Sequence, residues 1–372
     1  MQDRPGINIA GKGSGWVLYR EGTWTKVRDM VEGEVVPTGH IARRTLLDGG
    51  QYQKGEYTLK LADEQIRTIM LQGDNFIIDR KAGQVVVPVV YFGISDSETV
   101  YKDWLSDLKR YGTVRFMDWQ QTNKASKPQP WRDTSATIKT LVDAGIPAWV
   151  CIHATEMIFN VPAGVKFIES SNEVWNGQFP QGPQTGVDFA THMSRHLGKT
   201  RQVQKYAESI GARGVLGGWH YSPWWTDKML TDARTQGWKP DYVAIGAYWG
   251  HDLEDDIANF SNGAIDNAID LSLKLVREHK VICDRFGVKL ACYEAGQHIT
   301  KNGGVNCNRD ERMYNAYLIF FTGLFDIMGD DAVICSFAKT GTWGKFGSWG
   351  EREVFGVNTA KSKAIDLFKK RV

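Results

Sequence analysis

Two short segments of the sequence place a glutamate where it could take part in chemistry. Residues 171–176 (Ser-Asn-Glu-Val-Trp-Asn) contain Glu173, and residues 291–296 (Ala-Cys-Tyr-Glu-Ala-Gly) contain Glu294. Each segment is typical of a β-strand that ends on the carboxylate and continues into a loop beside Asn or Gly. Two carboxyl groups brought together at strand ends can cleave a glycosidic bond, one as the acid and the other as nucleophile or base.

The elements that would bring these glutamates together follow a regular order from residue 95 onwards. Predicted strands and helices alternate, which is typical of a parallel sheet covered by helices. The predicted strands are 113–119, 148–154, 165–171, 215–220, 242–249, 288–294 and 332–338, and the predicted helices are 183–211, 224–236, 264–286, 309–328 and 359–371. With a short strand at 7–11 counted first, there are eight strands, and we predict an α/β fold, a (β/α)8 TIM barrel.

Residues 16–94 show a different pattern of short alternating runs broken by glycine. Closely spaced short strands with turn signals predict a small antiparallel β-sandwich. Because the expected first barrel strand precedes this block, we predict that the block is inserted in the first βα connection. The expected domains are a barrel of residues 1–15 and 95–372 and a β-rich accessory domain of residues 16–94. Alternatively, these strands decorate the barrel without a core of their own.

A doubly wound sheet is the main rival architecture, and it usually carries a glycine-rich phosphate-binding turn after its first strand. Residues 11–15 (Gly-Lys-Gly-Ser-Gly) are rich in glycine, but no helical pattern follows them. They match neither common phosphate-binding motif in the required context. We therefore interpret them as a turn.

Composition narrows the classes of partner. The chain has 372 residues, 42% of them hydrophobic and 24% charged, and a net charge of +2. This balance argues against a nucleic acid or an anionic membrane as a partner. No apolar run is long enough for a membrane span, and residues 1–20 show no signal-peptide pattern. An extracellular location would be favoured only by the function, so the compartment stays open; a monomer is expected, with an oligomer not excluded.

Cysteine and histidine give no sign of a disulfide framework or a metal centre. The five cysteines are an odd number without the spacing of a zinc site, and those within predicted strands are expected to be small buried hydrophobic residues. The histidines at 153, 220, 251 and 298 show no paired spacing. A metal-dependent barrel hydrolase is therefore disfavoured, and we expect neither a metal nor a cofactor.

Active sites of such barrels form at the C-terminal ends of the strands. Besides the two glutamates, the predicted strand ends carry a cation, a phenol, an amide, imidazoles and indoles. They are Arg115, Trp119, His153, Asn172, Trp219, His220, Tyr248 and the region of Trp343. The 14 tryptophans suit a sugar-binding cleft, although a large domain also buries tryptophan in its core.

This set resembles clan A of the glycoside hydrolases, a group of retaining (β/α)8 enzymes. Its members carry an Asn-Glu pair at the end of strand four and a second Glu at the end of strand seven. Here these are Asn172-Glu173 and Glu294, on the strands predicted as fourth and seventh. The resemblance implies that Glu173 is the general acid/base, that Glu294 is the nucleophile, and that Asn172 binds the sugar 2-hydroxyl.

The same resemblance implies roles for further strand-end residues. Arg115 and Tyr248 would hold the nucleophile ionised and oriented. His153 is similar to the strand-three histidine of several families, and Trp343 to an aromatic platform after strand eight, a place that Trp349 could take instead. Trp119 and Trp219 would complete the substrate-binding set.

Structural roles stay open for several of these residues. Arg115 could pair with Asp118 or Glu169 instead, His153 could be an interior histidine, and Glu169 is a rival carboxylate on the strand face of Glu173.

A closer likeness is to poorly characterised proteins described as cellulose-binding. They share Arg-Phe-Met-Asp-Trp followed by Thr-Asn, here residues 115–119 and 122–123, and Ser-Asn-Glu-Val-Trp-Asn, here residues 171–176. The barrel resemblance covers residues 95–372.

The predicted function is a retaining glycoside hydrolase for β-linked polysaccharides or oligosaccharides, with its two carboxyl groups about 5–5.5 Å apart. The alternative is a glycan-binding barrel without catalysis, which would have no need of both glutamates.

Overall fold

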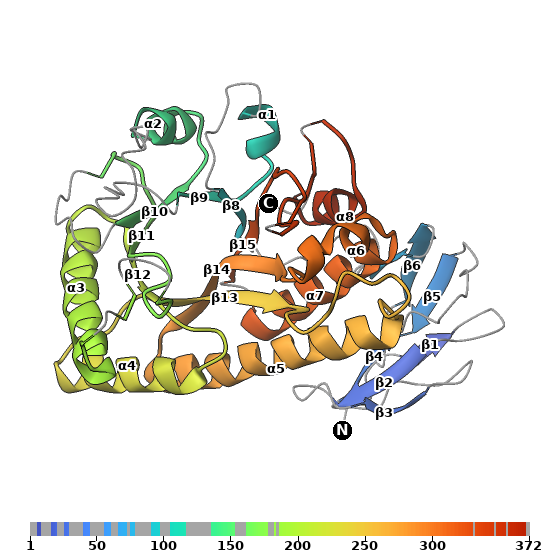
Figure 1. Ribbon diagram of the computed structural model, residues 1–372, viewed down its shortest axis with the longest axis horizontal. Helices are drawn as coiled ribbons and strands as arrows, with labels where there is room; N and C mark the ends of the chain where they lie inside the picture. Colours follow the sequence, from blue (N-terminus) through green and yellow to red (C-terminus); the bar gives the residue numbers. More distant parts are fainter. Residues whose placement is uncertain are drawn as a thin grey trace.

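The computed structural model describes residues 105–116, 135–152, 161–177, 182–183, 186–329, 332–345, 347–354 and 356–369, and the strands that lie between Gly6 and Asp96. Parallel strands close into a barrel (Figure 1). In order around it these are β8 (Tyr91–Asp96), β9 (Thr113–Phe116), β10 (Ala148–Ile152), β11 (Phe167–Ser170), β12 (Arg213–Gly217), β13 (Tyr242–Trp249), β14 (Lys289–Gln297) and β15 (Val333–Phe337). Since β15 also pairs with β8, the ring is closed, and the predicted (β/α)8 fold is confirmed.

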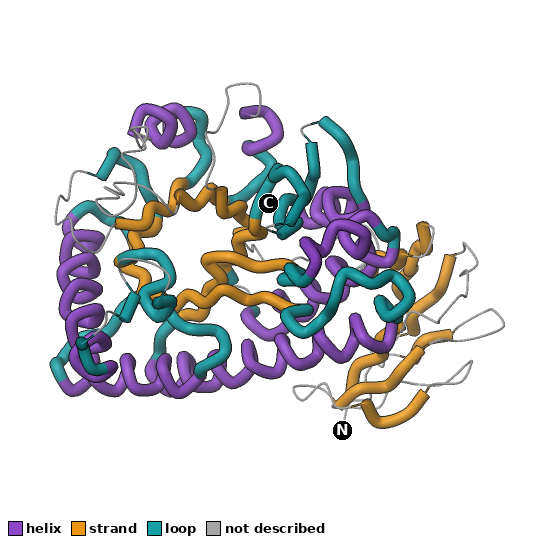
Figure 2. The backbone as a smooth tube through the Cα atoms, viewed as in Figure 1, coloured by secondary structure: helices purple, strands orange, loops and turns teal. Residues whose placement is uncertain are grey.

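Helices surround this ring of strands, as Figure 2 shows in purple around orange. They are α1 (Leu105–Leu108), α2 (Ser135–Asp143), α3 (Phe189–Ser209), α4 (Pro223–Thr235), α5 (Asn262–Phe286), α6 (Val305–Arg309), α7 (Arg312–Met328) and α8 (Ala360–Lys369), with a short 3-10 turn η2 (Asn302–Gly304) before α6. The observed bounds differ from the predicted ones by a few residues. None of the described helices combines the length and apolar character that a membrane span needs.

Capping residues fix where the longer helices begin and end. Ser222 and Ser261 accept hydrogen bonds from backbone N–H groups at the starts of α4 and α5, and Pro223 occupies the first position of α4. Gly287 ends α5 with φ of 62°, in the left-handed region that glycine adopts at little cost. These caps therefore mark the starts of α4 and α5 and the end of α5.

The core has two parts. One lies between strands and helices, and the other fills the barrel interior with alternate residues of the strands. The interior residues include Trp149, Phe167, Val215, Tyr242, Ala244, Ala291, Tyr293, Val333 and Cys335. All five cysteines are free and buried, as expected for small hydrophobic side chains.

The prediction that residues 7–11 form the first barrel strand is wrong. β1 (Gly6–Asn8) pairs antiparallel with β5 (Glu56–Lys60), in a separate sheet completed by β6 (Ile66–Gln72) and β7 (Asn75–Ile78). A second small sheet joins β2 (Trp16–Arg20) to β3 (Lys26–Asp29) and β4 (His40–Arg44).

The first barrel strand is instead β8, which begins inside the predicted β-rich block of residues 16–94 and ends just beyond it. A short apolar run fits either kind of sheet, so its pattern could not decide between them. The strands of the block lie at one edge of Figure 1 and precede the barrel in sequence, so they are not inserted in its first connection. That residues 16–94 form an accessory domain stays a prediction.

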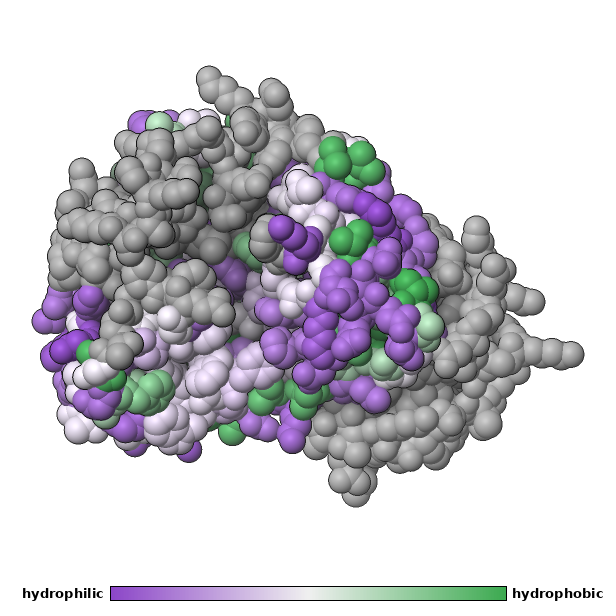
Figure 3. Space-filling view, viewed as in Figure 1, coloured by the Kyte–Doolittle hydropathy of each residue, from purple (hydrophilic) through white to green (hydrophobic). Residues whose placement is uncertain are grey.

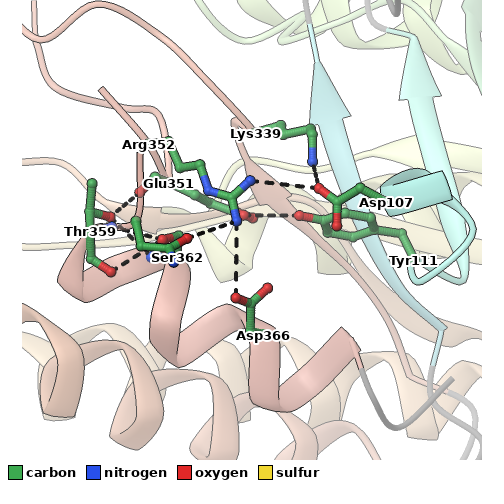
Figure 4. Close-up of polar contacts among 9 residues, drawn as sticks. Asp107, Tyr111, Lys339, Glu351, Arg352, Thr359, Ser362 and Asp366 are labelled. Carbon is green, nitrogen blue, oxygen red and sulfur yellow. Dashed lines mark hydrogen bonds and ion pairs between the residues drawn. The ribbon is translucent and has the colours of Figure 1, made fainter. Parts of the chain in front are cut away.

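Ionic contacts and a hydrogen bond hold the connection between β15 and α8 (Figure 4). Lys339 pairs with Asp107 of α1, and Arg352 lies 3.7 Å from the same carboxylate. The Tyr111 hydroxyl donates to Glu351 at 2.9 Å. The loop that carries both Trp343 and Trp349 is therefore held against α1 and the start of β9.

The packing of α5 on α7 offers a test of the fold. A Cβ at Gly323 would lie 2.4 Å from Leu273 Cδ1, so the two helices approach closely and Leu273 is fully buried. Leu273→Ala should lower the free energy of unfolding by about 2–5 kcal/mol, because it leaves a cavity there. Leu271→Ala, at a half-exposed position of the same helix, should change it by less than about 0.5 kcal/mol. Urea unfolding of both variants measures this, and equal losses would contradict the packing.

Candidate active site

One fully buried guanidinium joins three of the residues singled out from the sequence. Arg115 of β9 donates from Nε to Glu169 Oε2 at 2.8 Å, from Nη1 to Glu294 Oε1 at 3.0 Å, and from Nη2 to Asn172 Oδ1 at 2.8 Å. Charge-assisted hydrogen bonds of this kind are stronger than neutral ones. Arg115 thus pairs with Glu169, as the structural alternative held, and with Glu294 at the same time.

Strand register places the base of this cluster inside the barrel. Trp149 of β10 is the register partner of Arg115, and Cys151 is the partner of Glu169 on β11. Since these partners share a face of the sheet, Arg115, Trp149 and Glu169 all point into the barrel. The Trp149 indole N–H donates to Glu169 Oε2 at 3.0 Å, so this one oxygen accepts from Arg115 of β9 and from Trp149 of β10.

A β-bulge turns Glu294 towards the site. Ala291 and Tyr293 fill the barrel interior, so simple alternation would send Glu294 out towards the helices. The register between β13 and β14 shifts at this point, where Gly246 pairs with Glu294 and Tyr293 has no partner on β13. A bulge re-aims a side chain in this way. Glu294 then accepts from Arg115 and, through Oε2, from the Tyr248 hydroxyl at 2.7 Å.

A sharp turn positions Asn172 and Glu173 just beyond β11. Ser171 and Glu173 have φ values of 67° and 43°, a left-handed conformation that non-glycine residues seldom adopt. The Ser171 backbone N–H bonds the carbonyl oxygen of Ile152 at 2.7 Å, which holds the turn against β10. Glu173 is half-buried, and its Oε2 accepts from Asn176 Nδ2 at 2.9 Å.

Burial raises the pKa of both glutamates, with different opposing contacts. It raises the pKa of Glu294 to about 7; the positive charge of Arg115 and the Tyr248 hydroxyl act against this, and the negative charge of Glu173 adds to it. It also raises the pKa of Glu173, where the Asn176 amide acts against it. Glu294 accepts from a cation and a phenol, two contacts that favour its ionised form, whereas Glu173 accepts from a neutral amide.

The other predicted substrate-binding residues have mixed outcomes. Trp119 and His153, together with Asp118, lie outside the described residues. Trp219 is partly buried and stacks on Trp175, with ring centroids 5.5 Å apart and planes 8° apart.

Trp343 is buried in the loop after β15. Its indole N–H donates to the Gly350 carbonyl oxygen at 3.1 Å, and Lys361 Nζ lies 4.5 Å from the ring centroid. These contacts tie Trp343 to α8 and to its own loop.

Trp349, the alternative in the same loop, lies beside the site instead. Its ring centroid is 5.8 Å from that of Tyr248 and 4.6 Å from that of His298. His298 follows β14 directly and faces His251, with their Nδ1 atoms 3.3 Å apart. The sequence analysis did not assign His298 to the site, although its place just after the strand of Glu294 was a usable signal.

His220, another strand-end candidate, makes buried contacts to α5 that fit a structural role. Its Nε2 lies 3.2 Å from Ser272 Oγ of α5, its carbonyl oxygen lies 3.0 Å from His279 Nε2, and burial lowers its pKa to about 3. Across the described ranges, no three His, Cys, Asp or Glu side chains are arranged to hold a metal ion.

Comparison with known proteins supports the fold. No protein-family model and no curated protein matches the chain. A GH51 arabinofuranosidase from Xanthomonas axonopodis pv. citri matches with a TM-score of 0.53 at 14% identity, covering 77% of this chain and 70% of that one. A psychrophilic family 10 endo-β-1,4-xylanase (TM-score 0.49, 10% identity, 74% and 96% covered) and a Bacteroidetes-affiliated GH5 cellulase (0.48, 13%, 76% and 91%) also match.

At 14% identity, the likeness to the GH51 enzyme shows a shared fold alone. The likeness to cellulose-binding proteins stays a prediction.

In the space-filling view, the face over the barrel is hollowed near its centre (Figure 3).

The raised pKa of Glu294 predicts a pH-dependent stability. The group ionises near 4.5 in the unfolded chain and at about 7 in the folded protein. The stability it contributes is therefore fully present below 4.5 and is lost as the pH rises towards 7. Glu294→Gln lacks this loss, so its free energy of unfolding relative to wild type should rise between pH 5 and pH 8, by on the order of 2 kcal/mol.

Urea unfolding at the two pH values measures this difference. Glu278→Gln, at an exposed position of α5, is the control and should follow wild type at both. A Glu294→Gln curve parallel to wild type would show that burial does not act on this carboxyl.

Proposed function

We propose that the chain is a retaining glycoside hydrolase that acts on β-linked glycans. The observation that carries this proposal is the unequal bonding of the two glutamates at one barrel end. Glu294 accepts from Arg115 and Tyr248, and Glu173 from a neutral amide. A double displacement needs this division, with an ionised nucleophile and a protonated acid.

In the first step, Glu294 attacks the anomeric carbon as Glu173 gives its proton to the leaving oxygen. The glycosidic C–O bond breaks and an ester bond to Glu294 forms, so the leaving sugar departs as an alcohol. Arg115 and Tyr248 hold the attacking carboxylate in place, which keeps its lone pairs directed at one position.

In the second step, Glu173 is a carboxylate and takes a proton from water. The hydroxide oxygen bonds the anomeric carbon, the ester bond breaks, and Glu294 is a free carboxylate again. Two inversions at the same carbon give net retention of configuration. The two glutamates complete this cycle without a cofactor.

Aromatic and amide groups around the pair are proposed to bind the sugar. Asn172 is oriented by Arg115 and is assigned to the 2-hydroxyl, in keeping with the clan resemblance. Trp349 and the stacked Trp175 and Trp219 supply aromatic faces beside the two glutamates. Trp119, His153 and Trp343 stay predictions from the sequence, and the contacts of Trp343 favour Trp349 for the platform.

Removal of either glutamate provides the first test. Wild type should release reducing ends from at least one member of a panel of β-linked plant and bacterial polysaccharides. Glu294→Gln should lower kcat on that glycan on the order of 10⁴-fold, because the nucleophile is lost. Glu208→Gln, at an exposed position of α3, should retain full activity. Binding of a glycan without cleavage by wild type would replace the proposal by a binding module.

The role of Glu173 makes a separate prediction about pH. In wild type, kcat/KM should rise and then fall with pH, because the reactive form of the coupled pair carries one proton between Glu294 and Glu173. With an aryl glycoside whose leaving group needs no protonation, Glu173→Gln should retain the rising limb and lose the falling one. A falling limb that persists in this variant would assign the acid to another residue.

A further inference from the structure

A third carboxyl group lies beneath the proposed catalytic pair. Glu169 has no exposed surface, and its Oε2 accepts from Arg115 Nε at 2.8 Å and Trp149 Nε1 at 3.0 Å. Its Oε1 is also buried and has no hydrogen-bond partner among the described residues. A buried charge with one unpartnered oxygen is costly, and such a group calls for an explanation. The proposed double displacement leaves Glu169 without a role.

Glu169 controls the direction in which Arg115 points. A guanidinium has its N–H donors in a fixed planar fork, so a bond at Nε fixes the directions of Nη1 and Nη2. In this structure those two nitrogens bond Glu294 and Asn172. Glu169 therefore acts on both through a single side chain.

The charge of Glu169 also reaches both proposed catalytic groups. Its negative charge raises the pKa of Glu294 and of Glu173. The titratable or charged groups around Glu169 and Glu294 from the packed strands and the adjoining turn are Arg115, Cys151, Glu173, Tyr248, Tyr293 and Cys335. In this set Arg115 is the cation, and it faces three carboxyl groups.

We propose that Glu169 is a positioning residue of the active site, which orients Arg115 towards Glu294 and Asn172 and whose charge sets the pH range of the reaction. The inference rests on the proposed function. Without the negative charge of Glu169, the positive charge of Arg115 would stabilise the Glu294 carboxylate more strongly. Both proposed catalytic groups would then release their protons at lower pH.

Glu169→Gln separates the charge from the shape of the side chain. Its amide oxygen can accept from Arg115 and Trp149 as Oε2 does, and its nitrogen replaces the oxygen that has no partner. In substrate-free protein, carboxyl ¹³C NMR, with the Glu294 signal assigned by Glu294→Gln, should show the pKa of Glu294 lowered on the order of one unit. Glu351→Gln removes another buried carboxylate, bonded to Tyr111, and should leave that pKa unchanged.

Activity provides a second readout. In Glu169→Gln both limbs of the kcat/KM profile should move to lower pH together, whereas a merely structural role would lower the rate without moving them. Glu169→Ala removes the acceptor of Arg115 Nε, and kcat should fall about 10²-fold at nearly constant KM, because Arg115 no longer holds Glu294.

An unchanged pKa of Glu294 in folded Glu169→Gln would overturn the inference. If that pKa shifts while wild type cleaves no glycan, the proposed function fails and the positioning role of Glu169 holds.

Discussion

The guanidinium of Arg115, buried in the barrel interior, is the interaction on which the rest of the site depends. A charge without contact to water is tolerated only where bonded groups replace the lost hydration. Here the replacement comes from three places in the chain: Glu169 inside the barrel, Asn172 just beyond β11, and Glu294 on β14. Each nitrogen of the guanidinium thus bonds one of these three residues, and the closed barrel brings them within reach.

Two local departures from regular strand geometry complete this arrangement. The bulge in β14 moves the Glu294 side chain to the inner face of the barrel, where it reaches the guanidinium. Glu173 comes beside Glu294 because Ser171 and Glu173 adopt left-handed φ values. Both features cost stability in isolation, and they persist where surrounding contacts determine them. The result is two carboxyl groups with different hydrogen-bond partners in one site, the condition under which their protonation states separate.

The sequence predicted the barrel and most of this site for a physical reason. Strand–helix alternation and strand-end polar residues are local patterns, so Arg115, Asn172, Glu173, Tyr248 and Glu294 could be found one strand at a time. The strand numbering held although β1 is not in the barrel, because β8 is the first strand of the ring and the count of eight is kept. The bulge beside Gly246 and the burial that raises the pKa of Glu294 depend on neighbouring strands, and no pattern within β14 shows them.

Local sequence could not show which of Trp343 and Trp349 lies beside the site. Both lie in one glycine-rich loop, and their neighbours in sequence do not distinguish them. The decision comes from α8, where Lys361 is fully buried, lies over the Trp343 ring and donates to the Ser348 carbonyl oxygen at 2.7 Å. Lys361 also donates to the Trp349 carbonyl oxygen at 3.4 Å, and the ring of Trp349 faces Tyr248. The loop that places Trp349 beside Tyr248 is therefore held by contacts with α8, and these contacts lie outside any sequence pattern of the loop itself.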